Sequence, residues 1–260
     1  YIQVGKVQTA EVTKEPITVT VTLTKEELAQ ISDSRKLGAY YVDASGNLEY
    51  VGGKLKGDKI SFTVTQTGNY VLMVYEKSFT DIGSTHWAKT YIEVLAARHI
   101  LQGKTDKQFD GSAAVTRAEM AAMLGRALNL KGTNIQNSFK DVQGDSWYAG
   151  YVSELKELGL MTGYNDNSFK PNQKITREEM AVLIARTYNY LMKENSSSEI
   201  ELEFKDASSI ALWAQDSVKE TCGLGIINGT PNNSFLPKQT ATRAETAKML
   251  FKLLEITEQF

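Results

Sequence analysis

The stretch VTRAEM, at Val115–Met120, recurs twice along the chain, as ITREEM at Ile175–Met180 and as ATRAET at Ala241–Thr246. In each copy a Thr stands directly before a run of apolar residues at helical spacing, and a Glu follows three residues later. This spacing is typical of a capping box, in which the Thr hydroxyl and the Glu carboxylate each accept a hydrogen bond from the other's backbone amide. The predicted capping residues are Thr116, Glu119, Thr176, Glu179, Thr242 and Glu245.

The Arg at the first helical position of each copy, Arg117, Arg177 and Arg243, has no role in capping. A helix N-terminus carries a partial positive charge, so a cation there is unfavourable by roughly 0.3 kcal/mol, and some other group must offset it. The residues alone leave two explanations open. Each Arg could pair with an acidic residue of its own or a neighbouring repeat, and the candidates are Asp81, Asp141 and Asp206. Alternatively, the guanidinium and the free amides of the helix start could together bind a carboxylate or phosphate group of a ligand.

The three motifs close three repeats of about 60 residues. Each repeat begins with a Phe-x-Asp segment, then carries a Trp, an apolar helical stretch and a glycine turn. The Asp landmarks are 60 and 65 residues apart, and the turn glycines are 60 and 66 apart. The extra residues fall in KENSSSEIE, a polar linker at Lys193–Glu201. A period this regular indicates a repeat architecture, with repeats at 79–138, 139–203 and 204–260.

Each repeat is predicted to supply two helices, one near the Trp and one that begins at the Thr-Arg motif. Apolar residues at helical spacing form a stripe on each helix, and each stripe needs a partner to bury it. Three such units can bury their stripes around a shared axis, whereas an open solenoid would need capping repeats. We therefore expect a closed bundle with approximate threefold symmetry.

Residues 1–78 are predicted to form strands instead. PITVTVTL, KISFTVT and YVLMVYE alternate with period two, and Ala44–Asn47 is a turn between LGAYYV and LEYVGG. One short helical turn, capped by Thr24, is expected in TKEELAQI. The prediction is a small β-sandwich of five to seven strands, so the whole chain is an α+β multidomain protein. It begins at Tyr1 in strand-like sequence with no visible signal peptide, and we expect it to be a piece of a longer protein whose upstream part could hold further strands.

Composition excludes several classes of function. The chain has 260 residues and a net charge of −2, without a basic run that would indicate nucleic-acid binding. No apolar run of about 18 residues indicates a membrane span. A single cysteine, Cys222, excludes an intrachain disulfide and is expected to be a small buried residue. No cofactor or metal site is expected.

An enzyme and a calcium-binding module are two other classes of function that the sequence could indicate. No nucleophile elbow, zinc-protease or Walker motif is present, so no enzyme is indicated. A calcium loop is the second alternative, in NDNSFKPNQKITRE. It places Phe169 where a third oxygen ligand is needed and Lys170 where glycine is required, so it fails the EF-hand pattern twice.

The repeats resemble S-layer homology domains. The resemblance rests on the initial Phe-x-Asp, the Trp that follows it, the glycine loop that ends in Phe, and the Thr-Arg-x-Glu motif, and it covers about 180 residues from Phe79. It implies a pseudo-threefold helical prism, a secreted protein at the bacterial cell surface, and non-covalent binding of a secondary cell wall polysaccharide, often one with pyruvate ketals. It also implies that Arg117, Arg177 and Arg243 face the glycan carboxylate in grooves between repeats.

The copies differ in ways that predict unequal grooves. The third motif ends in Thr246 where the others have Met, and the first loop lacks the proline found at Pro171 and Pro237. Glycine lets a ligand approach the backbone closely, so a sugar-contacting role is assigned to Gly103, Gly163 and Gly229. For Trp87, Trp147 and Trp213, core packing is the first interpretation and stacking on a sugar face the second. Tyr164 is interpreted as a solvated loop residue.

The predicted function is therefore a non-catalytic anchor that binds an acidic, pyruvylated wall glycan, without nucleic-acid binding or membrane insertion. The alternative is the C-terminal part of a secreted glycoside hydrolase or S-layer protein, in which these residues only scaffold or mediate protein contacts. A catalytic domain is expected upstream in the parent protein, and the β-domain is expected to be a spacer.

Overall fold

The computed structural model describes residues 2–10, 15–133, 139–193 and 200–260. Most of the predicted linker Lys193–Glu201 therefore lies outside the described residues. The chain divides into two compact units, an N-terminal unit of residues 1–109 with 258–260 and a helical unit of residues 110–257.

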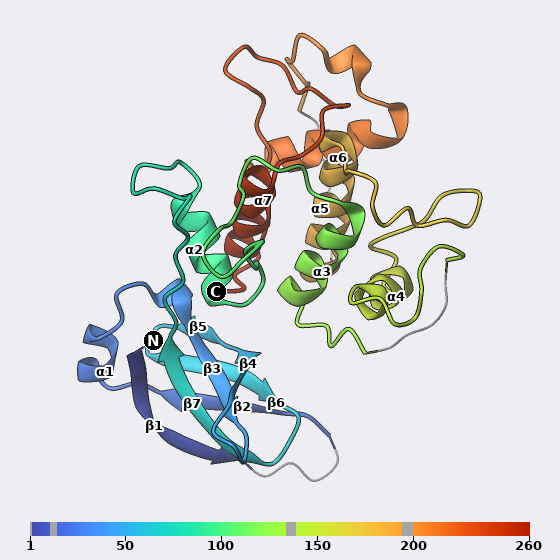
Figure 1. Ribbon diagram of the computed structural model, residues 1–260. Helices are drawn as coiled ribbons and strands as arrows, with labels where there is room; N and C mark the ends of the chain where they lie inside the picture. The colour runs from blue at the N-terminus through green and yellow to red at the C-terminus, as the bar shows by residue number, and fades with distance from the viewer. Residues whose placement is uncertain (1, 11–14, 134–138, 194–199) are drawn as a thin grey trace. The chain divides into compact units, whose positions relative to one another are not determined.

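The N-terminal unit is built on two small antiparallel sheets (Figure 1). One sheet has the order β1-β7-β3-β4, and its strands are β1 (Ile2–Ala10), β7 (Gly68–Val74), β3 (Leu37–Val42) and β4 (Leu48–Gly52). The other has the order β2-β6-β5, with β2 (Ile17–Thr22), β6 (Lys59–Val64) and β5 (Lys54–Lys56). The predicted strands and the β3–β4 hairpin are confirmed, with seven strands among the described residues.

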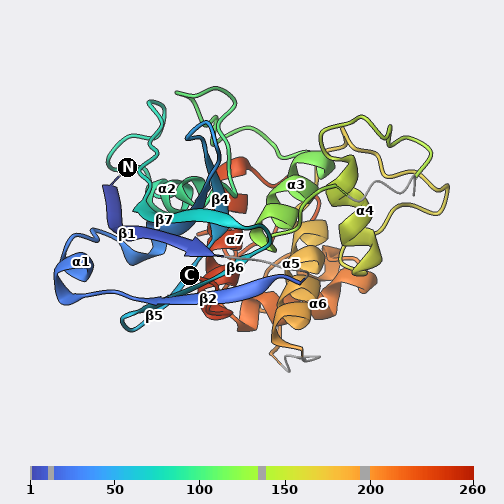
Figure 2. The ribbon, with the colours of Figure 1, turned by 90° about the horizontal axis from the view of Figure 1, so that it is seen from below.

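The two sheets share one apolar core, as expected from the period-two patterns. In β6 the side chains of Ile60, Phe62 and Val64 alternate with more exposed neighbours and pack against buried residues of β3 and β7. The two sheets are seen as separate layers in Figure 2, with β1 and β7 in one and β2 and β6 in the other. The short helix α1 (Lys25–Ala29) begins with the predicted capping box of Thr24.

The first helix of the first repeat, α2 (Lys89–Ala97), ends against the β1-β7-β3-β4 sheet within the N-terminal unit. The buried Arg98 donates from Nε to the carbonyl of Arg35, in the 3₁₀ turn Ser34–Lys36, and from one terminal nitrogen to the carbonyl of Gly53. His99 packs among the rings of Tyr40, Tyr50 and Tyr75, with centroid separations of 5.1–5.7 Å. The sheet is therefore fixed to the start of the first repeat by side-chain contacts as well as by the chain.

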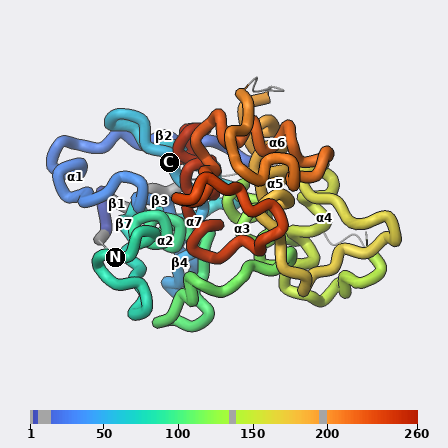
Figure 3. Tube along the Cα trace, turned by 90° about the horizontal axis from the view of Figure 1, so that it is seen from above, coloured from blue at the N-terminus to red at the C-terminus, as the bar shows by residue number. Residues whose placement is uncertain are grey.

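The helical unit holds the remaining helices of the repeats. Three begin at the predicted Arg residues, namely α3 (Arg117–Ala127), α5 (Arg177–Met192) and α7 (Arg243–Ile256). The others are α4 (Ala149–Glu157) and α6 (Leu212–Gly223), which a 3₁₀ turn at Ala207–Ser209 precedes. The long helix α5 packs beside α6 of the next repeat, as Figure 3 and Figure 2 both show.

A closed ring of backbone hydrogen bonds joins the three Thr-Arg motifs. The amide of Val115 donates to the carbonyl of Ala241, that of Ala241 to Ile175, and that of Ile175 back to Val115, each at 3.0 Å. All three residues are fully buried. Each repeat is thus bonded to both others through the residue that precedes its capping Thr.

Candidate functional site

The capping boxes form in all three repeats. In α5 the backbone amide of Thr176 donates to Glu179 Oε2 at 2.8 Å, and the amide of Glu179 donates to the Thr176 hydroxyl at 3.3 Å. The same pair of bonds is present at Thr116 with Glu119 and at Thr242 with Glu245. One carboxylate oxygen of each Glu serves the cap, so the other oxygen is available for a second partner.

That second oxygen faces the Arg of the neighbouring repeat. Arg177 donates from one terminal nitrogen to Glu245 Oε1 at 2.9 Å, and Arg117 lies 4.0 Å from Glu179 Oε1. Arg243 is paired in the same way with Glu119, at 3.8 Å. The three Arg residues and three Glu residues therefore alternate around the unit, which links every repeat to the next.

Backbone carbonyls occupy most of the remaining donors of these arginines. Arg117 donates from Nε to the carbonyl of Phe169 and from a terminal nitrogen to that of Thr162, both at 2.8 Å. Arg177 bonds the carbonyls of Phe235 and Asn228 in the same pattern. The arginines are only 3–6% exposed. The structure thus supplies ion pairs that offset the cation at each helix start, but the partners are the capping Glu residues and not the suggested Asp81, Asp141 and Asp206.

The backbone amides at the helix starts, which the ligand explanation requires to be free, are also bonded. The amides of Arg117 and Ala118 donate to the carbonyls of Gln173 and Pro171, which belong to the next repeat. The amides at the start of α5 and α7 donate to neighbouring loops in the same way. With the third amide held by the capping Thr, the first three amides of each of these helices already have a partner.

The Asp of the Phe-x-Asp segment instead shapes the loop that receives the Arg. Asp141 accepts hydrogen bonds from the amides of Phe169 and Lys170 at 2.7 and 2.8 Å, and it holds Lys170 in the left-handed conformation with φ 55°. Asp206 bonds Phe235 and Leu236 in the same way. This arrangement aims the carbonyls of Phe169 and Phe235 at the arginines of the preceding repeats.

The loop glycines have a packing role. A Cβ atom added at Gly163 would lie 2.2 Å from the ring of Phe139 and 2.6 Å from the carbonyl oxygen of Ser168. The corresponding distance to a Phe ring is 2.6 Å at Gly103 and 2.5 Å at Gly229. The close approach that glycine permits here is therefore to the Phe of its own Phe-x-Asp segment.

The three repeated tryptophans are exposed, and the core-packing interpretation of them is wrong. Trp87, Trp147 and Trp213 are 56%, 61% and 60% exposed. Trp87 precedes α2 and Trp147 precedes α4, whereas Trp213 lies in the first turn of α6. The apolar periodicity of the helices suggested burial, but the Trp stands at the helix start, outside the stripe that packs.

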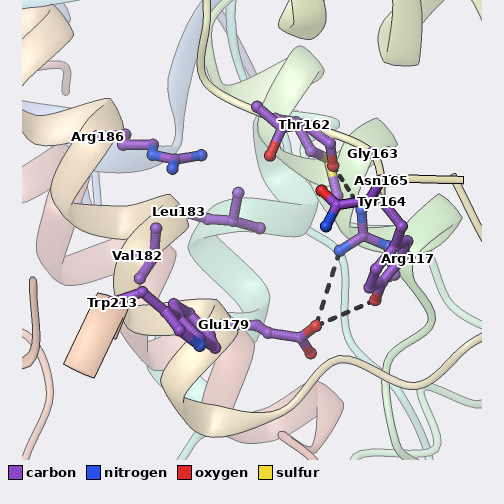
Figure 4. A pocket seen from close by; sticks show the side chains of 11 residues that line it. Arg117, Thr162, Gly163, Tyr164, Asn165, Glu179, Val182, Leu183, Arg186 and Trp213 are labelled. Atoms are coloured by element: carbon purple, nitrogen blue, oxygen red, sulfur yellow. Dashed lines mark hydrogen bonds and ion pairs between the residues drawn. The ribbon is translucent and has the colours of Figure 1, made fainter. Parts of the chain in front are cut away.

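A pocket of about 540 Å³ lies in the helical unit where residues of three repeats meet, and we name it the Trp213 pocket (Figure 4). The first repeat contributes Arg117, and the second contributes the loop at residues 161–165. The wall along α5 consists of Glu179, Val182, Leu183 and Arg186. The third repeat contributes Trp213. Its volume lies within the range of small-ligand sites.

On the loop side of this pocket, the charge of Arg117 is paired with that of Glu179. The hydroxyl of Tyr164 donates to Glu179 Oε1 at 3.2 Å, and the guanidinium of Arg117 lies 4.9 Å from the Tyr164 ring centroid. Burial raises the pKa of the Tyr164 phenol above its usual value. Tyr164 is therefore a half-buried loop residue whose hydroxyl is bonded within the protein.

The opposite side of the pocket carries the cation of Arg186. Arg186 is exposed, and it forms no ion pair with another described residue. In Figure 4 its guanidinium lies across the pocket from Arg117, and no dashed line joins it to the other side chains drawn. A guanidinium in this position can bind a carboxylate through two parallel hydrogen bonds.

Reasoning from the sequence missed Arg186, although a signal was present. A basic residue stands ten positions after the capping Thr in every repeat, as Arg126, Arg186 and Lys252. Arg126 lies over the ring of Tyr151 and Lys252 pairs with Glu255, so these two cations have partners. Only contacts in the fold distinguish Arg186 from them.

Other candidate chemistry is weak among the described residues. Cys222 is half-buried, and burial raises the pKa of its thiol to about 11, so it is a poor nucleophile. Within the described ranges there is no group of three or more His, Cys, Asp or Glu residues that could hold a metal ion. None of the described helices is long and apolar enough to cross a bilayer.

Comparison with known proteins identifies the repeats. The family model described as S-layer homology domain matches residues 78–121, 138–181 and 203–247. These three matches together cover half of the chain, and each ends shortly after a Thr-Arg motif.

The chain is also similar to parts of much longer proteins. It is 40% identical to an amylopullulanase of Thermoanaerobacterium thermosulfurigenes, over 93% of this chain and 13% of the relative. It is 43% identical to the exoglucanase XynX of Acetivibrio thermocellus and 33% identical to an S-layer protein of Bacillus thuringiensis subsp. finitimus, each over 68% of this chain. The chain spans only 16% and 21% of those two relatives. The match to the amylopullulanase covers more of the chain than the three repeats, which begin at residue 78. It therefore includes strands of the N-terminal unit.

Proposed function

Because the chain belongs to the S-layer homology domain family, we propose that it anchors a larger protein non-covalently to the bacterial cell wall. Relatives that share these repeats include S-layer proteins and glycan-degrading enzymes, which differ in the rest of their length. A module common to such different proteins suits a shared location at the cell surface. In this proposal the chain itself performs no catalysis, and any hydrolytic activity belongs to other parts of the parent protein.

The proposed ligand is an acidic wall polysaccharide, with a pyruvate ketal as the source of its carboxylate. The observation that carries this proposal is the Trp213 pocket, which combines an exposed aromatic face with the cation of Arg186, for which the described residues supply no ion pair. Sugar rings present apolar faces and hydroxyl groups, so an indole ring and a few polar groups suit them. A carboxylate on the sugar is the natural counter-ion of a guanidinium.

The proposed roles within the pocket are divided between the two arginines. Arg186 contacts the carboxylate, whereas Arg117 holds the loop of the second repeat in place and presents its remaining donor at the edge of the pocket. Trp213 stacks on a sugar, and Gly163 borders it. The equivalent residues of the other repeats are proposed for the same roles in their own grooves: Arg177, Arg243, Gly103, Gly229, Trp87 and Trp147. We further propose that the three repeats complete a pseudo-threefold prism, which the ring of hydrogen bonds through Val115 supports.

Sedimentation with purified cell wall sacculi tests the function. The chain should co-sediment with intact sacculi and stay in solution after the wall polysaccharide has been removed chemically. Binding that persists after removal would show that the polysaccharide is not the ligand.

Single substitutions then test the pocket. Arg186→Gln should weaken binding of the soluble polysaccharide about tenfold or more, because hydrogen bonds to charged groups contribute roughly 1.5–3 kcal/mol. Lys131→Gln removes the same charge from an exposed position outside the pocket and should leave binding unchanged. If both variants bind like the unaltered chain, the Trp213 pocket is not the binding site. Calorimetry or a pull-down at fixed salt concentration provides the measurement.

A role in protein contacts is the second candidate, favoured by the exposed pair Leu212 and Trp213, which are 85% and 60% exposed. Leu212→Ser separates the two functions, because Leu212 does not line the pocket. Loss of a protein partner without loss of glycan binding would support the second candidate.

A further inference from the structure

A second hollow lies along α5 beside the Trp213 pocket. This second pocket, of about 390 Å³, shares Arg186 with the first, and we name it the Lys193 pocket. It is lined by the turn Leu158–Leu160 after α4, by Asn189 and Tyr190 of α5, and by Lys193, the C-cap residue of that helix. Arg186 therefore lines both hollows, which lie next to each other along α5.

The spacing of the lining residues along α5 places them on one face of the helix. Val182, Arg186 and Tyr190 are each four residues apart. At 1.5 Å per residue this face extends for about 12 Å, and Lys193 follows it as the C-cap residue of the helix. This face is longer than a single pyranose ring, so a linear glycan could lie along it.

The chemistry of the Lys193 pocket suits a second acidic sugar. The Tyr190 side chain is 45% exposed, and Lys193 is exposed beside it. Among the described residues that line this pocket there are two cations and no carboxylate. Both Arg186 and Lys193 can move toward a ligand, since no ion pair with a described residue holds either of them.

This extension is specific to the second repeat. Helix α5 has 16 residues, whereas α3 has 11 and α7 has 14. The positions that correspond to Tyr190 are occupied by Leu130 and Ile256, and those that correspond to Lys193 by Thr133 and Gln259. The pairing of an aromatic ring with a cation at the end of the helix is therefore found in one repeat of the three.

We infer that the Lys193 pocket is a second subsite, which takes the adjoining sugar of the same wall polysaccharide and binds a second anionic group on it. The groove of the second repeat thus selects a fragment of two or more sugars over a single sugar. This inference rests on the proposed function of the Trp213 pocket as the first subsite.

The test is calorimetric titration of the whole chain with size-separated fragments of the wall polysaccharide, from single acidic sugars to tetrasaccharides. The unaltered chain should bind the longer fragments about tenfold more tightly than the single sugar, which corresponds to about 1.4 kcal/mol. The double variant Tyr190→Ala, Lys193→Asn should lose this preference and keep its affinity for the single sugar. Asn is chosen because Lys193 has φ 56°, a left-handed conformation that Asn tolerates.

Lys131→Gln is the matched control for the lost charge, and it should retain the preference for longer fragments. Equal affinity for all fragment lengths in the unaltered chain, or a preference that survives in the double variant, would overturn the inference while leaving the first subsite in place. Failure of every fragment to bind would instead overturn the proposed function and with it the second subsite. Thermal unfolding of the double variant verifies that the helix is intact, since both side chains are exposed.

Discussion

At the scale of single residues, the arginines of the helical unit serve two different purposes. The guanidinium groups of Arg117 and Arg177 are buried and bonded to carbonyl groups of the next repeat, whereas that of Arg186 is exposed. A buried cation needs its partners to offset the cost of leaving water. Replacing such a residue should therefore lower the free energy of unfolding, and any loss of ligand affinity should follow from that loss of stability.

The first prediction follows for Arg177. Arg177→Ala leaves the carboxylate of Glu245 and the carbonyls of Phe235 and Asn228 without this donor, so we expect a loss of about 3–5 kcal/mol in the free energy of unfolding. Urea denaturation provides the measurement. Arg186→Ala should change the same free energy by no more than about 0.5 kcal/mol, because its side chain is exposed. Similar losses in the two variants would contradict the division of roles.

At the scale of single elements, the capping box serves both the helix start and the contact between repeats. The carboxylate of Glu179 accepts from the amide of its capping Thr through one oxygen and from Tyr164 through the other. A change at the capping Thr therefore also reaches this carboxylate, whose Oε2 accepts from the Thr176 hydroxyl at 3.1 Å.

Thr176→Ala removes the hydroxyl that accepts from the amide of Glu179 and donates to its carboxylate. We expect the chain to lose about 1 kcal/mol of stability. Thr176→Ser keeps the hydroxyl oxygen, so its free energy of unfolding should differ from that of the unaltered chain by only about 0.3 kcal/mol. The measurement is the midpoint of denaturant unfolding for each variant, compared at the same slope. If both variants lose the same amount of stability, the hydroxyl is not the cause of the loss.

The end of α2 gives a prediction for pH. Burial lowers the pKa of His99 below its usual value of about 6.5, because its ring packs among Tyr40, Tyr50 and Tyr75. The folded N-terminal unit therefore favours the neutral imidazole. Its stability should be complete above about pH 6.5 and should fall as the pH drops below that value, since the unfolded chain takes up the proton more readily.

Hydrogen exchange of amides in β3 and β7 at pH 7.5 and pH 5 measures this effect. Protection should decrease at the lower pH in the unaltered chain. In His99→Asn, which keeps a residue that tolerates the φ of 56° found here, protection should change less with pH. An equal decrease in both proteins would mean that other groups cause the pH dependence.

At the scale of the whole molecule, the helical unit is closed by the ring of amides and carbonyls at Val115, Ile175 and Ala241. Each repeat is held by both others, so the three motifs should open together. This differs from a linear array, where each repeat contacts only its neighbours along the chain.

Ile175→Ala tests this coupling. The side chain is fully buried, and its truncation should cost about 2–5 kcal/mol. If the ring opens as one, hydrogen exchange at Val115 and Ala241 should accelerate by a similar factor, although both lie in other repeats. Acceleration confined to the second repeat would show that the motifs open independently.

Local signals in the sequence were sufficient for the elements. The period-two runs predicted the strands, and the Thr and Glu of each motif predicted where α3, α5 and α7 begin, because capping and alternation depend on residues a few positions apart. The repeat was equally visible, since its landmarks recur along one chain. The family followed from the same landmarks.

The partners of side chains were decided only by the tertiary structure. The Arg of one repeat meets the capping Glu of the next across 62 to 68 residues of sequence in Arg117–Glu179 and Arg177–Glu245, which no local pattern encodes. The exposure of the tryptophans and of Arg186 likewise depends on which surfaces the neighbouring repeats cover. The sequence by itself therefore determined the helices, the strands and the family, because these depend on short-range spacing. Only packing between repeats decided which arginines are buried against neighbouring loops and which one stays exposed.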